Sequence, residues 1–320
     1  MLSDDLAAAF APLPRPRTVL AGVSGGADST ALVHLLHHYA AALEITRLAI
    51  AHVNHNLRGP ESGGDEAFVR ETAKRLGIEI FCAGLDGSSA ANSKDGVEEW
   101  ARRHRYAFFT NTAKANSFNY IATAHTINDQ AETVILRMAR GSGLRGLRGI
   151  LPVREDGVIR PLIRTERQAL TGWLAERGID WREDSSNADT KFRRNLVRAK
   201  IIPLLNDINP AAVKNIAACA EEAAKAWEAA ERNIDAWIKK YVLRVNEDAF
   251  HIEKAGLDGT AAAVDALVAL FDDYGITPSR LHIERILSSA ATSRGEHLLP
   301  DGWKFYPRED RVCFVREGGR

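Results

Sequence analysis

Short apolar runs alternate with amphipathic stretches through the first 140 residues of the chain. The apolar runs read as buried strands and cover residues 18–23, 46–53, 78–82 and 119–124. The stretches between them carry apolar residues at three- and four-residue spacing and predict helices at 30–36, 65–76, 97–114 and 129–140. Strands that alternate with helices indicate a parallel, doubly wound sheet of the α/β class. Ligands of such a sheet bind beyond the carboxyl ends of its strands.

The pattern changes in the second half of the chain. Further elements are predicted there: a strand at 158–163, a helix at 166–177, a turn at 184–187 and a helix that runs to Pro203. An alanine-rich stretch from Ala211 to about Val242 predicts one long helix, and the remainder predicts two strand pairs around two helices. We therefore expect three parts: an α/β domain over 1–208, a helical connector over 209–242 and a small α+β C-terminal domain over 243–320.

The chain of 320 residues has 42 Lys and Arg against 42 Asp and Glu, so its net charge points to no class of partner. The distribution is uneven. Eight arginines and three acidic residues lie between Arg137 and Arg167, and residues 191–200 hold five cations and no acid. Either cluster alone is typical of a solvated helix face, but two together favour a polyanionic substrate such as nucleic acid.

The three cysteines, Cys82, Cys219 and Cys313, are isolated in apolar runs, and we expect them in the core. Without a C-x-x-C pair, the sequence encodes no local zinc or iron–sulfur site. The first ten residues carry no basic leader, and no uninterrupted apolar run reaches the roughly 18 residues that span a membrane. We therefore expect a cytoplasmic protein with no membrane partner.

A glycine-rich turn follows the first predicted strand and precedes the first predicted helix. It consists of Ser24, Gly25, Gly26, Ala27, Asp28 and Ser29. Two glycines allow a tight turn, and the free amides of a helix start together with the two hydroxyls make an anion site. Asp28 would repel a bare phosphate, which is explained if Mg²⁺ lies between them. A helix cap by Asp28 or Ser29 is the alternative, but it accounts for only one or two of the six positions.

Two further strand ends carry polar residues. His52 opens the sequence H-V-N-H-N-L-R, which can line a nucleotide cleft or serve only as a turn, and both interpretations stay open. His125 precedes Asp129 and Glu132, which share one helix face and could hold Mg²⁺ or an ammonium group. The opposite stripe, expected to face the core, consists of Ala131, Val134, Ile135 and Met138. The alternative is a capping role, with Asp129 as N-cap and Glu132 three residues later.

Arginines near these ends are candidate phosphate ligands. Arg102 and Arg105 could reach phosphates across a cleft, although their spacing alone favours a surface position. Arg145 and Arg148 lie in the glycine-rich stretch 141–149, for which we expect a flexible loop that follows an RNA backbone or acts as a lid.

The glycine-rich turn resembles the pyrophosphate-binding loop of the N-type ATP pyrophosphatases, which split ATP into AMP and pyrophosphate. Over residues 18–205 the chain resembles the tRNA(Ile)-lysidine synthetases of that group. The matching blocks are S-G-G-A-D-S, H-V-N-H-N-L-R-G-P-E-S, A-R-R-H-R-Y, N-D-Q-A-E-T, R-G-S-G-L-R-G-L, R-P-L-I and D-S-S-N-A-D-T-K-F-R-R-N-L-V-R. One departure is Ala124-His125-Thr126, where the family often has Gly-His-His.

The resemblance implies an ATP-dependent ligase that forms a C–N bond. Such enzymes adenylate the C2 oxygen of the wobble cytidine in isoleucine tRNA, and free lysine then displaces AMP to give lysidine. ATP and Mg²⁺ are the implied cofactors, and the anticodon loop of the tRNA and lysine are the implied partners. The small C-terminal domain is expected to bind tRNA. The oligomeric state stays open, with a homodimer as one option.

The resemblance also assigns roles to residues. The expected catalytic residues are Asp28, Asp129, Glu132, His125, Arg102 and Arg105, with Asp28 as the Mg²⁺ ligand. The expected ATP-binding residues are Ser24, Gly25, Gly26, Ala27, Asp28, Ser29 and His52. The expected tRNA-binding residues are Arg58, Arg145, Arg148, Asn187, Arg194, Asn195 and Arg198.

Three rival functions remain. A tRNA 2-thiolation enzyme shares the loop, but such enzymes usually carry paired cysteines. An amide-forming ATP pyrophosphatase that acts on a small molecule, such as an NAD or GMP synthetase, leaves the arginine clusters unexplained. A regulatory ATP-binding module leaves Asp28 and the Asp129/Glu132 pair without a purpose.

Overall fold

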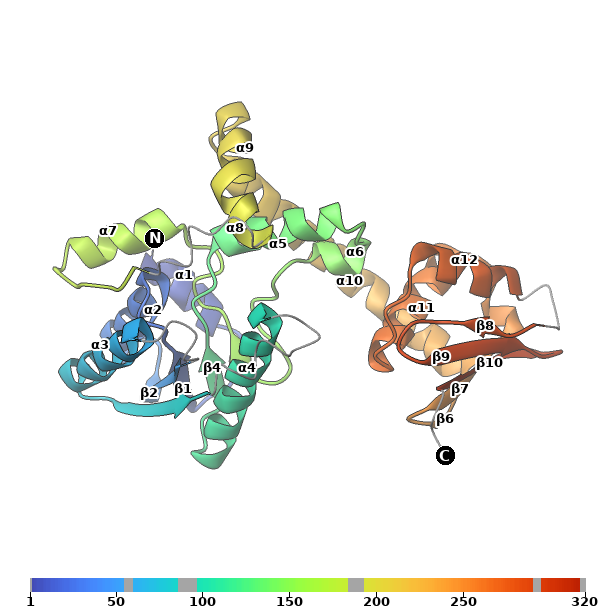
Figure 1. The fold of residues 1–320 in the computed structure, drawn as a ribbon, viewed down its shortest axis with the longest axis horizontal. Helices are drawn as coiled ribbons and strands as arrows, with labels where there is room; N and C mark the ends of the chain where they lie inside the picture. Colours follow the sequence, from blue (N-terminus) through green and yellow to red (C-terminus); the bar gives the residue numbers. More distant parts are fainter. Residues whose placement is uncertain (1, 55–59, 86–96, 184–192, 290–294, 317–320) are drawn as a thin grey trace. The chain divides into compact units, whose positions relative to one another are not determined.

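The computed structural model describes residues 2–54, 60–85, 97–183, 193–289 and 295–316 (Figure 1). The chain divides into two compact units, Met1–Ala223 and Ala224–Arg320. The boundary falls within one helix, α10 (Ala212–Tyr241), so the three-part division at residues 208 and 242 stays a prediction. No helix within the described residues has both the length and the apolar character needed to cross a membrane.

The first unit is built on a five-stranded parallel sheet, as predicted. Its strands are β1 (Arg17–Gly22), β2 (Ile45–Asn54), β3 (Glu79–Gly84), β4 (Tyr120–Ala122) and β5 (Val158–Ile159). They lie in the order β3-β2-β1-β4-β5. Because the winding reverses between β1 and β4, the switch point where such sheets bind ligands lies beyond the carboxyl ends of these two strands.

Helices cover both faces of this sheet. The helices of this region are α1 (Leu2–Phe10), α2 (Ala27–His38), α3 (Pro60–Leu76), α4 (Val97–Ala115), α5 (Ile127–Ala139), α6 (Leu144–Leu147) and α7 (Arg167–Ala175), and the contacts with the strands come chiefly from α2, α3 and α4. Alternate residues of β1 enter different cores: Val19 packs with Leu32 of α2, and Leu20 packs in the cluster of Phe109 of α4. Strands buried on both faces explain the continuous apolar runs of the sequence.

After α7 the chain forms α8 (Arg193–Leu196), a π-helical turn (Val197–Ile201) and α9 (Ile202–Ile208). Two expectations for the first unit are wrong. The strand predicted at 158–163 ends at Ile159, because the buried Leu162 and Ile163 lie in a turn. The stretch 141–149 is no open loop: it contains α6, and Nη1 of Arg137 donates to the carbonyl oxygens of Gly146 and Gly149 at 2.6 and 2.7 Å.

The second unit packs helices against an antiparallel sheet of order β6-β7-β10-β9-β8. Its strands are β6 (Val242–Asn246), β7 (Ala249–Glu253), β8 (His297–Leu298), β9 (Trp303–Pro307) and β10 (Arg311–Arg316). Its two main helices are α11 (Ala261–Asp273) and α12 (Arg280–Ser289), and its core contains the stacked rings of Phe250 and Phe314. The described part of this unit therefore has five strands where two pairs were expected.

Cys219 on α10 is exposed, which corrects its expected core position.

Candidate active site

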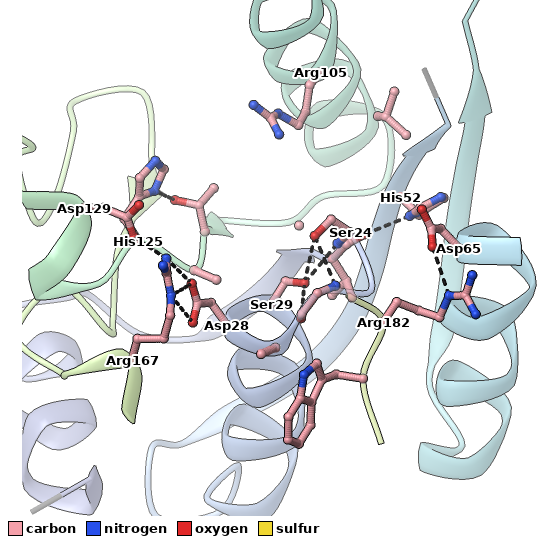
Figure 2. Close-up of a pocket in the computed structure, with 18 of the residues that line it drawn as sticks. Ser24, Asp28, Ser29, His52, Asp65, Arg105, His125, Asp129, Arg167 and Arg182 are labelled. Atoms are coloured by element: carbon pink, nitrogen blue, oxygen red, sulfur yellow. Dashed lines mark hydrogen bonds and ion pairs between the residues drawn. The ribbon is translucent and has the colours of Figure 1, made fainter. Parts of the chain in front are cut away.

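A cavity of about 780 Å³ opens beyond the carboxyl ends of β1, β2 and β4 (Figure 2). The predicted residues Ser24, Gly26, Ala27, Asp28, Ser29, His52, Arg105, His125, Asp129, Arg194 and Arg198 line it. Residues that we did not predict also line it, among them Asp65, Tyr106, Arg167, Trp181 and Arg182. Its position is the switch point of the sheet, where α/β folds bind ligands.

The glycine-rich turn forms one wall of this cavity. Gly25 has φ +98°, which is strained for any residue with a side chain. Gly26 is the N-cap of α2 and makes no side-chain cap bond. The hydroxyl of Ser29 accepts from the amide of Ser24 at 3.1 Å and donates to the carbonyl of Gly26 at 3.0 Å. The turn is thus closed by short-range bonds at the start of a helix, which is a ready anion site.

A distant segment supports the outer side of the turn. The amide of Arg182 donates to the carbonyl of Gly25 at 2.9 Å, and Nε of Arg182 donates to Oδ1 of Asp65 on α3 at 3.1 Å. The sequence offered no sign of this contact, since Arg182 follows the turn by more than 150 residues. It ties the carbonyl group of Gly25 to a segment far along the chain.

His52 is buried, with an exposed fraction of 3%. Its Nδ1 lies 2.8 Å from the carbonyl oxygen of Val23, and since a carbonyl only accepts, the proton is on Nδ1. Nε2 is then an acceptor, and it has no hydrogen-bond partner among the residues that the structure describes. A buried acceptor without a partner is costly, and a donor group on a ligand would satisfy it.

Asp28 lies in the first turn of α2 and pairs with Arg167, the first residue of α7. Nη2 of Arg167 is 2.7 Å from Oδ2 of Asp28. Burial raises the pKa of the Asp28 carboxyl and the charge of Asp129 adds to this, while Arg167 acts in the opposite direction. The helix dipole disfavours a cation at the start of a helix. The position of Arg167 at the start of a predicted helix could therefore have indicated that an acidic partner lies nearby.

The acidic pair of α5 lies beside two arginines. Asp129 accepts from Nη2 of Arg194 at 2.9 Å. Glu132, with an exposed fraction of 1%, accepts at 2.7 Å from Nε of Arg194 and from Nε of Arg198. Burial acts to raise the pKa of Asp129, yet that pKa is lowered, chiefly by Arg194 and also by His125 and Arg167. The two carboxylates thus lie side by side and are paired with guanidinium groups in this structure, and their binding of Mg²⁺ or an ammonium group stays a prediction.

Two details of the α5 interpretation need correction. Thr126, not Asp129, is the N-cap: its amide and hydroxyl both donate to Oδ2 of Asp129, at 2.8 and 2.7 Å, in a capping box whose acid is Asp129. Capping and ion pairing thus use the same carboxylate. Met138, predicted to face the core, is 61% exposed, because α5 passes the edge of the core in its last turn.

His125 is partly buried, and its Nδ1 lies 3.0 Å from the hydroxyl of Thr123. Burial lowers its pKa to about 3, with a further contribution from Arg160 and opposition from Asp129. The imidazole is therefore neutral near pH 7. The imidazole can donate or accept a hydrogen bond with a ligand, but it has no positive charge that would neutralise a phosphate.

The remaining predicted residues have different positions. Arg105 lines the cavity, whereas Arg102 lies over the ring of Tyr106 and is not among the described lining residues. Nε of Arg148 donates to the carbonyl of Arg145 beside α6, and Asn195 lies on α8 outside the described lining. Glu132 lies behind Asp129 rather than on the cavity surface. Arg58 and Asn187 lie outside the described residues.

The model of the PP-loop domain family matches residues 2–205. The tRNA(Ile)-lysidine synthase of Solibacter usitatus (strain Ellin6076) is 38% identical over 294 residues, which are 88% of this chain and 64% of that one. The enzyme of the same name from Chlorobaculum tepidum is 41% identical over 190 residues, 59% of this chain and 57% of that one. The chain thus spans less than two thirds of the length of these relatives.

One solved structure adds support for the fold. The U34-tRNA thiolase NcsA from Methanococcus maripaludis, solved with its [4Fe-4S] cluster, superposes with a TM-score of 0.58. The match covers 69% of this chain and 76% of that one at 17% sequence identity. At so low an identity the similarity concerns the fold alone.

Proposed function

The chain belongs to the PP-loop domain family, and on that premise we propose that it is a tRNA(Ile)-lysidine synthetase. ATP adenylates the C2 oxygen of the wobble cytidine and pyrophosphate leaves. The amine nitrogen of lysine then bonds to C2 while the C2–O bond breaks, and AMP departs with that oxygen. The curated relatives with this name at 38% and 41% identity support the proposal.

One observation carries this function: an anion-binding turn and a buried acidic residue face the same cavity. The turn of Ser24 and Ser29 offers hydroxyls and the amides of a helix start, which suit the polyphosphate of ATP. Asp129 also lines the cavity and offers a negative charge, which suits an amine. A reaction that joins a nucleotide to lysine needs both, whereas simple nucleotide binding needs only the first.

We include Mg²⁺ in this proposal, with Asp28 as its ligand. Among the described residues no group of three or more His, Cys, Asp or Glu side chains comes together as a metal site. Mg²⁺ commonly takes only one or two carboxylates and completes its shell with phosphate oxygens and water. The Asp28 carboxylate, on the cavity wall at the mouth of the anion turn, fits that requirement. A bound ion would neutralise the charge that collects on the departing pyrophosphate.

The basic residues are proposed to hold the tRNA. Arg145 and Arg148 are partly exposed near α6, and the mouth of the cavity includes Arg105 and Arg194. Phosphate contacts from such groups position an RNA, and the target cytidine must leave its stack to enter the cavity. We extend the proposal to the second unit as a further tRNA contact.

The test is to incubate the protein with ATP, Mg²⁺, isoleucine tRNA and lysine, and to weigh the wobble nucleoside by mass spectrometry. We expect a gain of one lysine less one water. A parallel reaction with a sulfur donor in place of lysine should leave the nucleoside unchanged, since none of the described residues lining the cavity is a cysteine. Sulfur incorporation would establish the thiolation alternative, and AMP release without tRNA would indicate a small-molecule enzyme.

The role of the acidic pair can be tested separately. Asp129→Asn should raise the KM for lysine by about tenfold or more and change the KM for ATP only about twofold, because one charge facing the amine is lost. The matched control is Asp235→Asn on the exposed side of α10. An equal rise in both KM values would mean that Asp129 binds the nucleotide or only maintains the structure of the site.

A further inference from the structure

Arg167 connects two carboxylates that come from different helices, Asp28 of α2 and Asp129 of α5. Its Nε donates to both oxygens of Asp28, at 3.1 Å to Oδ1 and 2.9 Å to Oδ2, and its Nη2 lies 2.7 Å from Oδ2. The same Nη2 is 3.8 Å from Oδ2 of Asp129 (Figure 2). The guanidinium therefore neutralises Asp28 and has a second acid within reach.

The backbone of Arg167 is fixed, but its side chain has room to turn. Its amide donates to Oδ1 of Asn128 at 3.0 Å, which fastens the start of α7 to the start of α5. The side chain is 30% exposed and lies on the cavity wall. Since the helix dipole opposes a cation at this position, the neighbouring acids are what favour an arginine there.

A divalent ion at Asp28 would need the oxygens that Arg167 holds. Both oxygens of Asp28 accept from this guanidinium, so an ion bound there would lie beside a like charge. Arginine has two other partners available in the occupied cavity. One is Asp129, and the other is a phosphate oxygen, which a guanidinium binds with the same two-pronged geometry as a carboxylate.

We propose that Arg167 is an exchangeable counter-ion of Asp28, which balances this carboxylate in the nucleotide-free protein and moves to a phosphate oxygen when Mg²⁺ arrives with the nucleotide. The inference rests on the proposed function, because it requires a nucleotide in the glycine-rich turn. No covalent bond changes in the exchange. Asp28 is paired with a cation in both states, which allows an acid to remain in an anion-binding turn.

Calorimetry with α,β-methylene-ATP tests the exchange without turnover. Arg167→Gln removes the competitor of the metal, so the Mg²⁺ concentration for half-maximal nucleotide binding should fall about tenfold, the usual size of a close charge effect. In EDTA the same variant should bind the nucleotide about tenfold more weakly, because Asp28 then faces the phosphates unbalanced. The matched control, Arg164→Gln, removes an exposed arginine paired with Glu221 at 2.9 Å and should change neither value.

Binding of Mn²⁺ without nucleotide, followed by electron paramagnetic resonance, gives a second readout. Arg167→Gln should bind Mn²⁺ more tightly than the wild type, and Arg167→Lys, which keeps the charge but loses the fork, should fall between them. If Arg167→Gln does not fold, Arg167→Lys tests the proposal alone, and its affinity for Mn²⁺ should likewise exceed that of the wild type. An unchanged or higher metal requirement, in a protein whose wild type binds the Mg²⁺–nucleotide, overturns the exchange alone. A wild type that binds no nucleotide overturns the proposed function as well.

Discussion

The two walls of the cavity hold their polar groups in different ways. In the turn after β1, the hydrogen bonds of Ser24, Gly26 and Ser29 join residues no more than five positions apart. On the α5 side, Glu132 takes its partners Arg194 and Arg198 from 62 and 66 residues away. The side-chain bonds within the first wall are local, although the distant Arg182 amide also donates to Gly25, whereas the second wall exists only when separate segments have come together.

This difference has a consequence for binding. The turn presents the amides of a helix start, which need no rearrangement before an anion binds, as in other preorganised sites. The acidic wall is already neutralised by its arginines, so a substrate amine there must compete with guanidinium groups for Asp129. We therefore expect substitutions on the acidic side to have larger effects than substitutions within the turn.

Asp28 belongs to both walls, since it lies in the first turn of α2 and pairs with Arg167, and its removal should have the largest effect. Asp28→Ala is expected to lower the rate of pyrophosphate release about a thousandfold, which corresponds to about 4 kcal/mol of barrier. The loss combines an absent metal ligand with an uncompensated Arg167. A coupled pyrophosphate assay measures it, with Asp272→Ala in the second unit as a control. Normal turnover in Asp28→Ala would remove the metal assignment.

Glu132→Gln tests the acidic wall by stability. The substitution leaves two partly buried arginines without this carboxylate, and breaking a buried pair by removing one partner typically costs about 3 kcal/mol or more. Urea unfolding measures the change in the free energy of unfolding. The same exchange at Glu221, whose pair with Arg164 is exposed, should cost less than about 1 kcal/mol. Equal losses of unfolding free energy at Glu132 and Glu221 would mean that the buried ion pairs stabilise the fold no more than an exposed pair does.

The contrast between the walls also explains what the sequence could reveal. The strands β1 to β4, the helices α2 to α5 and the glycine-rich turn depend on local periodicity and on residues adjacent in sequence, and they were predicted. The roles proposed for Asp28 and Asp129 rest on residue type and on position at a strand end. Their partners were not, because Arg167 is 139 residues from Asp28 and nothing in a single sequence joins the two.

Other features that the sequence did not reveal have the same origin. The local charge cluster predicts that Arg194 and Arg198 contact RNA, and this role stays a prediction, but the cluster gave no sign that both residues bond to Glu132. The stretch 141–149 reads as flexible from its glycines, whereas Arg137, outside it, holds the carbonyls of Gly146 and Gly149. In each case a long arginine side chain donates to oxygen atoms of a distant segment, and the local sequence pattern does not indicate this partner.

His125 gives a pH test of the acidic side. Its pKa is about 3 in the folded protein against an ordinary 6.5, so between these values the unfolded chain binds a proton that the folded chain does not. The free energy of unfolding should therefore fall as the pH drops below 6.5, by about 2 kcal/mol at pH 5 from this residue. His125→Gln should lose that much less stability between pH 7 and pH 5 than the wild type. The control is the exposed His37→Gln, which should follow the wild type, and an identical pH response in His125→Gln would place a protonated imidazole in the folded site.

The smallest effect is expected within the turn itself. Ser29→Ala removes the bonds to Ser24 and Gly26 and should cost about 1 kcal/mol of stability and a few-fold in nucleotide affinity, because each bond is replaced in part by water. Double-mutant cycles then separate the walls. Ser24→Ala with Ser29→Ala should be non-additive by about 0.5 kcal/mol or more, since their hydroxyls lie 3.1 Å apart. Ser29→Ala with Glu132→Gln should be additive within about 0.5 kcal/mol, and strong coupling there would mean that the two walls act as one charge network.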